Sequence, residues 1–142
     1  NSLNPVMRIE AQIWDGILAH EGNVTQAELQ RRSDACLEGV GLDPKVVAKL
    51  YPHELSGGMK QRVCIAIGVC LSPDLIIADE PTSALDADAR DAFIDLMLEL
   101  AGEGRATVLF VSHDASLARH FDRAEDLPAL NRIPRGSGAD AA

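Results

Sequence analysis

Aromatic side chains and positive charge are both scarce in this 142-residue sequence. Aromatic residues make up 4% of the chain, and 13 Lys and Arg stand against 22 Asp and Glu, which gives a net charge of −9. A protein that binds the nucleic-acid backbone without regard to sequence needs a basic face, so this deficit argues against a nucleic-acid partner. Anionic membrane lipids are disfavoured for the same reason. Hydrophobic residues nevertheless reach 46%, which is typical of a globular protein with a core.

The sequence also has no long hydrophobic run. The longest extends over nine residues, Val63 to Leu71, whereas a helix that crosses a bilayer needs about 20 apolar residues. No basic segment followed by an apolar one opens the chain, so we expect no signal peptide. The sequence therefore predicts no membrane-spanning segment.

Cysteine is rare and lacks the spacing of a structural framework. Cys36, Cys64 and Cys70 are odd in number and form no CxxC motif. A disulfide framework or a zinc site is therefore not expected. Two of the cysteines lie in apolar surroundings, which favours buried, reduced thiols in a cytosolic protein.

The first third of the sequence carries helical signals and no strand signal. Over residues 8–20 apolar side chains recur at helical spacing. They are Ile9, Ile13, Trp14, Ile17 and Leu18. Thr25, with Glu28 three residues further on, forms a capping box that predicts a helix to about Gly39. A third, short helix is expected over residues 43–50, because the proline that follows Asp in this segment suits a first helical turn.

The character of the sequence changes at Ser56. An apolar helix is predicted from Met59 to Leu71, and Asp86 is expected to cap a further helix that extends to about Leu100. The inward face of that last helix is expected to carry four apolar residues, which are Phe93, Leu96, Met97 and Leu100.

Two short apolar segments, 75–78 and 107–111, have the pattern of strands that are buried on both faces. With a helix between them they predict a parallel β–α–β unit and thus an α/β fold. We expect residues 1–55 to form an α-helical subdomain and residues 56–130 to form the sheet-containing part. Residues 131–142 are expected to be a disordered tail.

Polar residues follow both predicted strands. Asp79 and Glu80 end the first, and Ser112, His113 and Asp114 end the second. Because ligands of an open parallel sheet bind beyond the carboxyl ends of its strands, these side chains are expected to meet at one edge. An Asp placed there can hold the magnesium of a nucleotide, a neighbouring Glu can polarise a water, and a His can contact phosphate. Taken singly, each motif is more often a strand exit, a cap or a turn.

The segment Ser56-Gly57-Gly58 is an unfavourable sequence for the first turn of a helix. Glycine lowers helix stability, but it lets backbone N–H groups approach an anion at the positive end of the helix dipole. The segment therefore predicts a surface that contacts phosphate.

Together these motifs resemble those of ABC-type ATPases. The residues 55–62, LSGGMKQR, are similar to the family's signature motif, and 75–82, LIIADEPT, are similar to its Walker B motif with the catalytic Glu. The residues 83–86, SALD, resemble the D-loop, and His113 resembles the switch histidine. The motifs stand in the family's order, and the matched stretch, 55–114, covers less than half of the chain.

The resemblance implies roles for the Walker B and switch residues. Asp79 is implied to hold Mg²⁺, and Glu80 to act as the general base in ATP hydrolysis. His113 is implied to hold the γ-phosphate and the attacking water in place. The catalytic residues expected from the resemblance are therefore Glu80 and His113.

The resemblance also implies that two subunits act together. Ser56, Gly57 and Gly58 would contact the γ-phosphate of ATP held by the opposite subunit, and Asp86 would couple the two sites. The neighbouring Lys60, Gln61 and Arg62 are as consistent with a solvated helix face as with a contact.

The first residues resemble one branch of the family. Ser2-Leu3-Asn4-Pro5 is similar to the segment that follows the Q-loop in the oligopeptide and dipeptide importer ATPases. The function implied is ATP-driven transport, with peptide import expected. The helical part, 6–51, would contact a transmembrane permease, and the protein would be cytoplasmic and peripheral on the inner face of the cell membrane.

The family's P-loop, GxxxxGK[ST], does not occur in this sequence. By the resemblance, the chain corresponds to the C-terminal part of the nucleotide-binding domain, without the adenine-stacking aromatic residue and the Q-loop Gln. The P-loop supplies most of the phosphate cradle, so the chain alone is expected to bind ATP weakly or not at all and to hydrolyse none. Two alternatives remain open, a non-hydrolysing binding module and an ABC ATPase outside transport. A C-terminal end shorter than that of the importers leaves an exporter-like ATPase open as well.

Overall fold

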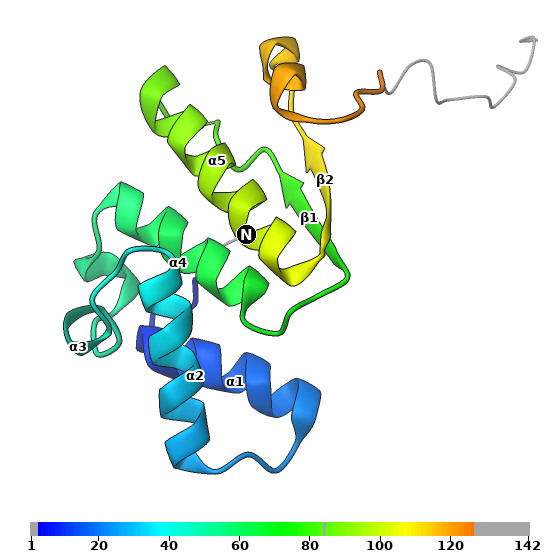
Figure 1. Cartoon of the computed structure of the whole chain (residues 1–142). Coiled ribbons are helices and arrows are strands. Elements are labelled where there is room, and N and C mark those ends of the chain that lie inside the picture. The colour runs from blue at the N-terminus through cyan, green and yellow to red at the C-terminus, as the bar shows by residue number, and fades with distance from the viewer. Residues whose placement is uncertain (1–2, 84, 127–142) are drawn as a thin grey trace, which may run out of the picture.

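A pair of parallel strands and the helices beside it make up the structure, a computed structural model that describes residues 3–83 and 85–126 (Figure 1). The predicted tail, 131–142, lies outside these residues. In chain order the elements are α1 (Ile9–Glu21), α2 (Gln26–Gly39), α3 (Pro44–Val47), the 3-10 helix η1 (Pro52–Glu54), α4 (Gly57–Val69), β1 (Leu75–Asp79), α5 (Ala87–Gly104), β2 (Thr107–Val111) and the 3-10 helix η2 (Ala115–His120).

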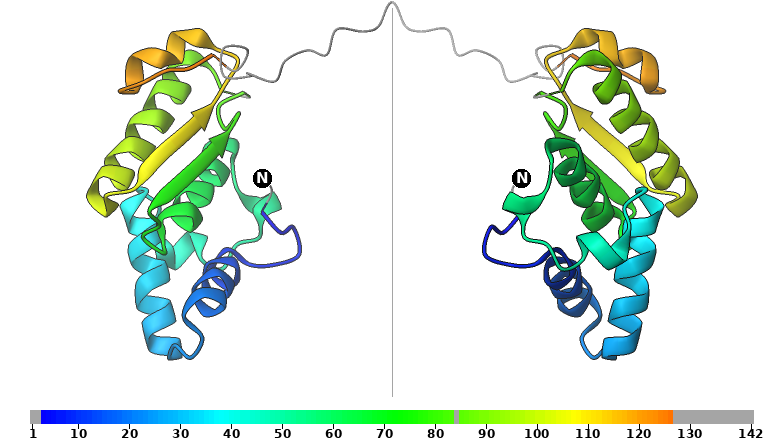
Figure 2. Two further views of the ribbon diagram at one scale, coloured as in Figure 1. Left: turned by 90° about the vertical axis from the view of Figure 1, so that its right-hand side faces the viewer. Right: turned by 90° about the vertical axis from the view of Figure 1, so that its left-hand side faces the viewer.

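The two strands confirm the predicted parallel β–α–β unit and the α/β class. β1 pairs with β2 in a register that sets Leu75 opposite Thr107 and Asp79 opposite Val111. Helix α5 makes the crossover between them and lies along one side of the strand pair, as Figure 2 shows. Both strands end at the same edge, because parallel strands run in the same direction.

The expectation that both strands are buried on both faces is wrong for the described residues. Leu75, Ile77 and Leu109 are 50%, 64% and 52% exposed. The alternate residues of the strands, among them Val108 and Phe110, pack against the hydrophobic core. Since side chains of a strand alternate between its two faces, the helices cover one face of this strand pair and leave the other open.

Three isoleucines anchor the helical part to the core. Ile9, Ile13 and Ile17 of α1 are completely buried, as their helical spacing predicts. The remaining two residues of the predicted stripe are less buried: Trp14 is half-buried and Leu18 is 39% exposed. The indole nitrogen of Trp14 donates a hydrogen bond at 3.1 Å to the hydroxyl of the buried Ser33 on α2, which joins the two helices.

Polar caps begin the helices where the sequence places them. Thr25 accepts a hydrogen bond from the backbone N–H of Glu28, and Asp43 accepts one from that of Lys45. The capping box is only half formed, however, because the Glu28 carboxylate pairs with Arg31 at 2.6 Å instead of reaching back to the helix start. That exposed pair adds little stability.

Helix α4 lies between the helical part and the β–α–β unit. It packs against α1 and α2 on one side and against α5 on another, and it buries Val63, Ile65 and Ala66. The predicted division after residue 55 stays a prediction, since α4 belongs to the packing of both parts.

The three cysteines differ in exposure. Cys70 is buried and Cys36 is half-buried, but Cys64 is exposed, so the prediction of a buried thiol is wrong for Cys64. The apolar context of Cys64 reflects neighbours along the chain, whereas its place on the helix turns it towards solvent. No helix in the described part of the chain is both long and apolar enough to cross a bilayer.

The burial of α1 makes a direct stability test. Ile13→Ala is expected to lower the free energy of unfolding by about 3 kcal/mol, because it removes a completely buried side chain and leaves a cavity. Leu18→Ala, on the exposed side of the same helix, is the matched control and should change it by less than about 1 kcal/mol. Urea unfolding followed by Trp14 fluorescence measures both, and equal losses would contradict the assignment of the buried face.

Candidate functional site

The carboxyl ends of β1 and β2 bring together the acidic residues and the histidine that the sequence singles out. Asp79 is the last residue of β1 and lies opposite Val111, the last residue of β2. The pairing continues one step further, because the backbone N–H of Glu80 donates to the carbonyl of Val111 at 2.9 Å. Glu80 is thereby fixed beside the turn that carries His113.

Glu80 has an unusual backbone conformation. Its φ is +46°, in the left-handed region that residues with a side chain seldom adopt. Strain of this kind persists where the surrounding contacts impose it, and it is often found at functional sites. Here it turns the chain out of the strand directly after Asp79.

The Glu80 side chain holds the start of the His113 turn. Its Oε1 accepts a hydrogen bond from the backbone N–H of His113 at 2.8 Å. The imidazole Nε2 of His113 lies 3.5 Å from the same oxygen, but the imidazole is 99% exposed. The two residues are therefore connected through the backbone, and the imidazole stays accessible to a ligand.

Asp114 and Arg90 anchor the same turn to α5, and the sequence predicted neither contact. The Arg90 Nη1 lies 2.6 Å from the Asp114 Oδ2, while the other carboxylate oxygen of Asp114 accepts from the backbone N–H of Ser116 at 2.9 Å. The hydrogen bonds from Ser116 lower the pKa of Asp114, and the charges of Arg90 and Arg119 add to this effect. The position of Asp114 after a strand indicates a cap, but no local pattern indicates Arg90 as its partner.

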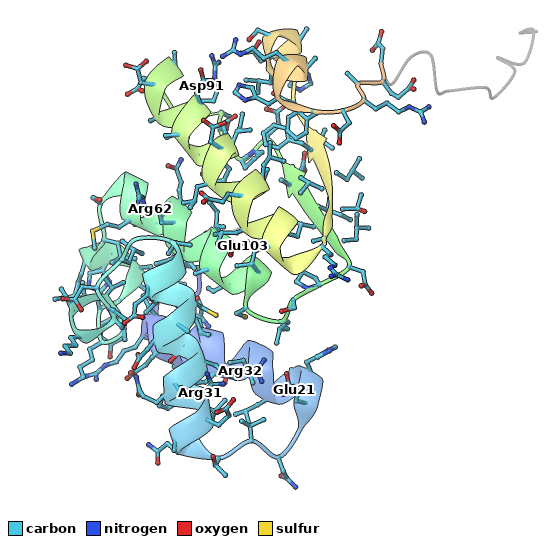
Figure 3. All side chains as sticks on the ribbon, in the orientation of Figure 1. Glu21, Arg31, Arg32, Arg62, Asp91 and Glu103 are labelled. Carbon is cyan, nitrogen blue, oxygen red and sulfur yellow. The ribbon has the colours of Figure 1, made fainter. Side chains whose placement is uncertain are left out.

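The end of η2 is held to α5 by a second set of polar contacts. Arg119 pairs with Asp91 at 2.7 Å, and the two imidazole nitrogens of His120 lie 3.4 Å from Asp91 and 3.5 Å from Asp95. Asp91 is labelled near the upper end of α5 in Figure 3. His120 is the last residue of η2.

The predicted phosphate-contacting segment begins α4. The Ser56 hydroxyl accepts a hydrogen bond from the backbone N–H of Met59 at 3.3 Å, which caps the helix. Gly57 and Gly58 are exposed, and no other atom lies within 4 Å of a Cβ built on either. The fold therefore leaves open space beside both glycines in the first turn of a 13-residue helix, the end at which backbone N–H groups lack partners within the helix.

Two basic residues, Lys60 and Arg62, follow the glycines and differ in their contacts. Lys60 is exposed, whereas Arg62, labelled in Figure 3, donates from Nη1 to the carbonyl of Val40 at 2.9 Å. Arg62 therefore joins α4 to the end of α2 and has a structural role.

Asp86 has a structural role that the sequence predicted. Its Oδ1 accepts a hydrogen bond from the backbone N–H of Ala89 at 2.9 Å, and α5 begins at the next residue. Thr82, in the turn before it, is 5% exposed. The coupling role implied for Asp86 stays a prediction.

The signature segment and the strand ends are separate within this chain. In Figure 1 the first turn of α4 lies on the left of α5, while the tips of β1 and β2 lie on its right. Glu80 and His113 thus form one site with Asp79 beside them, and Ser56, Gly57 and Gly58 form another.

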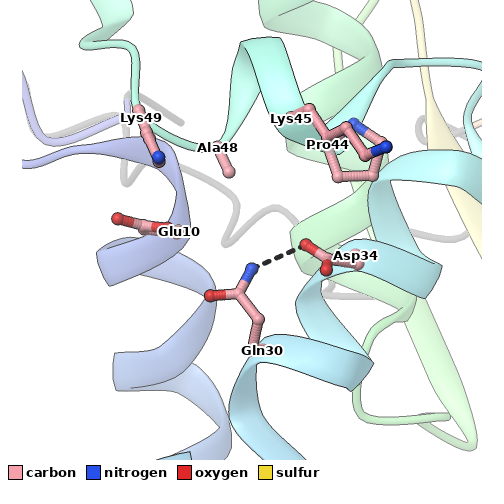
Figure 4. Close-up of a pocket in the computed structure, with 7 residues that line it drawn as sticks. All are labelled: Glu10, Gln30, Asp34, Pro44, Lys45, Ala48 and Lys49. Atoms are coloured by element: carbon pink, nitrogen blue, oxygen red, sulfur yellow. Dashed lines mark hydrogen bonds between the residues drawn. The ribbon is translucent and has the colours of Figure 1, made fainter. Parts of the chain in front are cut away.

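A pocket of about 250 Å³ lies away from both groups, between α1, α2 and the segment around α3 (Figure 4). Seven residues line it, namely Glu10, Gln30, Asp34, Pro44, Lys45, Ala48 and Lys49. Gln30 donates to Asp34 at 2.7 Å across its floor. Because the pocket mixes both charge signs and adjoins neither site, it does not serve the predicted chemistry.

The described residues contain no group of three or more His, Cys, Asp or Glu side chains that could hold a metal ion by themselves. Asp79 is exposed at the strand end. Protein-bound Mg²⁺ commonly takes one or two carboxylates together with waters and substrate phosphates. The arrangement thus fits a magnesium that arrives with a nucleotide and does not fit a closed metal site.

Comparison with known families decides the assignment. The sequence profile described as ABC transporter matches residues 1–83, which is more than half of the chain. The chain belongs to the ABC transporter family.

Two curated relatives of the chain are peptide transport proteins. The chain is 44% identical over 114 residues to the oligopeptide transport ATP-binding protein OppD of Lactococcus lactis subsp. cremoris. The aligned region covers 80% of the chain and 33% of OppD. It is 42% identical over 117 residues to the dipeptide transport ATP-binding protein DppD of Escherichia coli. That aligned region covers 82% of the chain and 36% of DppD. The chain spans about a third of the length of these relatives.

Solved structures show the same fold. The dimeric structure of MJ0796, a bacterial ABC transporter cassette, matches with a TM-score of 0.69 and 32% identity over 84% of this chain and 51% of that one. The same cassette has been solved in a post-hydrolysis state bound to ADP and Pi. The predicted family and fold class are therefore confirmed, whereas the roles of single residues stay predictions.

The open space at the signature glycines can be tested by substitution. Gly57→Ala and Gly58→Ala are each expected to keep the fold and to raise the free energy of unfolding by up to about 1 kcal/mol, because alanine favours the helix. Gly41→Ala is the matched control and should destabilise, since Gly41 has φ +70° and its Cβ would lie 2.9 Å from Arg62 Nη1. Urea unfolding measures all three variants. Destabilisation at 57 or 58 equal to that at 41 would contradict the open space that the structure shows at these glycines.

The Asp114 anchor predicts a pH dependence. A carboxylate whose folded pKa is lowered contributes stability above the ordinary Asp pKa of about 4 and loses it as the pH falls through the folded value. Asp114→Asn is therefore expected to be less stable than the parent at pH 7, with the difference shrinking in acid. Denaturant unfolding across this pH range measures the effect, and Asp122→Asn, at an exposed position after η2, is the control. A difference that persists unchanged in acid would contradict the ionic origin.

Proposed function

We propose that this chain carries the signature, Walker B and switch-histidine part of an ATP-hydrolysing subunit that powers an ABC transporter, with peptide import as its function. The observation that carries the proposal is the hydrogen bond from the His113 backbone to the Glu80 carboxylate at the strand ends, beside Asp79. It occurs in a chain that belongs to the ABC transporter family. The names of the relatives OppD and DppD support peptides as the cargo.

The geometry supports separate tasks for Glu80 and His113. The Glu80 carboxylate can accept a proton from a water, and its contact with the His113 backbone fixes its direction. The exposed His113 imidazole can donate a hydrogen bond to a phosphate oxygen beside that water. Asp79 would hold Mg²⁺, which when bound with ATP neutralises charge on the phosphates.

The separation of the two groups supports action across a dimer. Ser56 caps α4 and the two glycines lie in its first turn, which lies on the other side of α5 from the strand ends of the same chain (Figure 1). These three residues would therefore serve the γ-phosphate of ATP on a second ABC ATPase subunit, and Asp86 would couple the two sites. The dimeric cassette among the solved structures is consistent with this arrangement. Permease subunits would be the further partners, which would place the protein at the inner face of the cell membrane.

A second function, a binding module without hydrolysis, is favoured by one observation. The sequence contains no GxxxxGK[ST] motif, and a P-loop supplies most of the contacts to nucleotide phosphates. In that case the chain would dock its signature segment on a nucleotide held by a partner.

Hydrolysis is tested with Glu80→Gln in the ATPase cassette that joins this chain to a P-loop half. The variant is expected to bind ATP as tightly as the parent and to lose at least about 100-fold in turnover, because the amide cannot take up the proton of the water. Glu103→Gln, near the far end of α5 (Figure 3), is the matched control and should hydrolyse normally. Unchanged turnover in Glu80→Gln would contradict the role of Glu80.

The isolated 142-residue chain gives a separate prediction. Because it has no P-loop, titration with magnesium and ATP in a calorimeter should show no binding in the micromolar range. Micromolar affinity would contradict the dependence on a P-loop. Gly57→Ala provides the control for any weak signal from the signature segment.

A further inference from the structure

The pocket between α1, α2 and the segment around α3 carries negative and positive side chains at different depths (Figure 4). Glu10, Gln30 and Asp34 are half-buried and form its floor, whereas Lys45 and Lys49 are exposed and form its rim. We propose that this pocket binds a small zwitterion, a free amino acid or a dipeptide. The ammonium group of the ligand would lie in the floor and its carboxylate at the rim.

Backbone hydrogen bonds fix the walls of the pocket. The N–H of Ile9 donates to the carbonyl of Leu50 at 3.0 Å. The N–H of Glu10 donates to the carbonyl of Ala48, itself a buried lining residue, at 2.9 Å. These bonds tie the first turn of α1 to the segment that follows α3, and α3 packs against α2. The pocket is therefore formed before a ligand arrives, which lowers the free-energy cost of binding.

The floor offers hydrogen-bond acceptors to a cation. The Gln30 amide donates to the Asp34 Oδ1 at 2.7 Å, which fixes both side chains. Within the described residues the Glu10 carboxylate has no ion pair and no hydrogen bond. A half-buried carboxylate loses part of its hydration, and an ammonium group replaces that hydration with charge-assisted hydrogen bonds. The floor therefore favours a ligand that carries a primary ammonium group.

The rim supplies the complementary charge. In the part of the chain that the structure describes, the ammonium groups of Lys45 and Lys49 form no ion pair and no hydrogen bond. Two of the three lysines of a chain with a net charge of −9 thus line one pocket. The lysines repel a ligand that is only a cation, and the floor carboxylates repel one that is only an anion. A ligand with one charge of each sign satisfies both.

The size of the pocket limits the ligand. Sites for drug-sized molecules span about 300–1,000 Å³, whereas this pocket has a volume of about 250 Å³. An amino acid and a dipeptide are both small enough, and both carry an ammonium group at one end and a carboxylate at the other. They differ in the separation of these groups, since each residue adds at most about 3.6 Å.

The test titrates the 142-residue chain with glycylglycine, and separately with glycine, and follows both titrations by NMR. The side-chain amide of Gln30 is the direct reporter, because it lies in the floor of the pocket. We expect saturable shifts of its signals with a Kd in the millimolar range, since the ligand is small and the rim lysines are exposed. Tighter binding of glycine assigns the pocket to free amino acids, and tighter binding of glycylglycine assigns it to dipeptides.

Analogues that lack one charge test both ends of the ligand. N-acetylglycylglycine has no ammonium group, and glycylglycinamide has no carboxylate. Each is expected to bind at least about 10-fold more weakly than glycylglycine, because each loses a charge-assisted hydrogen bond. N-acetylglycine and glycinamide make the same comparison for glycine. The proposal is overturned if Gln30 shows no saturable shift with either zwitterion, or if the analogues bind as tightly as their parents.

Substitutions in the pocket give a second, independent readout. Glu10→Gln removes a floor charge, and the double variant Lys45→Gln/Lys49→Gln removes both rim charges. Each should weaken zwitterion binding at least about 10-fold while circular dichroism shows an unchanged fold. Asp15→Asn, at an exposed position of α1, and Lys60→Gln, at an exposed position of α4, are the controls and should bind like the parent. Parent-like binding by Glu10→Gln or by the double variant would overturn the proposal. No arm of the test involves ATP, so its outcome is separate from that of the proposed function.

Discussion

The structure depends on the burial of one helix from two sides. α4 places Val63 and Ala66, both completely buried, among the apolar side chains of its neighbours, with α1 and α2 on one side and α5 on another. Burial of this kind contributes roughly 25 cal/mol for each Å² of apolar surface removed from water. The helical part and the β–α–β unit therefore share one core, and the first turn of α4 is the part of the helix left outside it.

The functional groups follow from this arrangement. Helix α5 packs against β2, and the parallel register of β1 with β2 sets the ends of both strands at one edge. Glu80 leaves that edge in a left-handed conformation, and its carboxylate meets the backbone of His113. The exposed signature glycines lie elsewhere, so the two groups that we propose to contact nucleotide occupy separate surfaces of this chain.

Local signals in the sequence predicted much of this, and long-range contacts account for the rest. Thr25 and Asp86 cap the helices as predicted, because capping depends on residues only three positions apart. The open face of the strand pair was not predicted, because a continuous apolar segment has the same sequence pattern whether helices cover one face of the strand or both. The contact between Arg90 and Asp114 joins residues 24 positions apart, and no spacing rule reveals such a partner.

Native-state hydrogen exchange followed by NMR tests the shared core most directly. The account predicts that the amides of buried residues in α1, α4 and α5, such as Ile13, Val63 and Ile94, exchange with the same free energy of opening, equal to that of global unfolding. Amides of the first turn of α4, at Gly57 and Gly58, should exchange much faster. Separate opening of the helical part, with α1 exchanging while α4 and α5 stay protected, would contradict the claim that α4 unites the two parts.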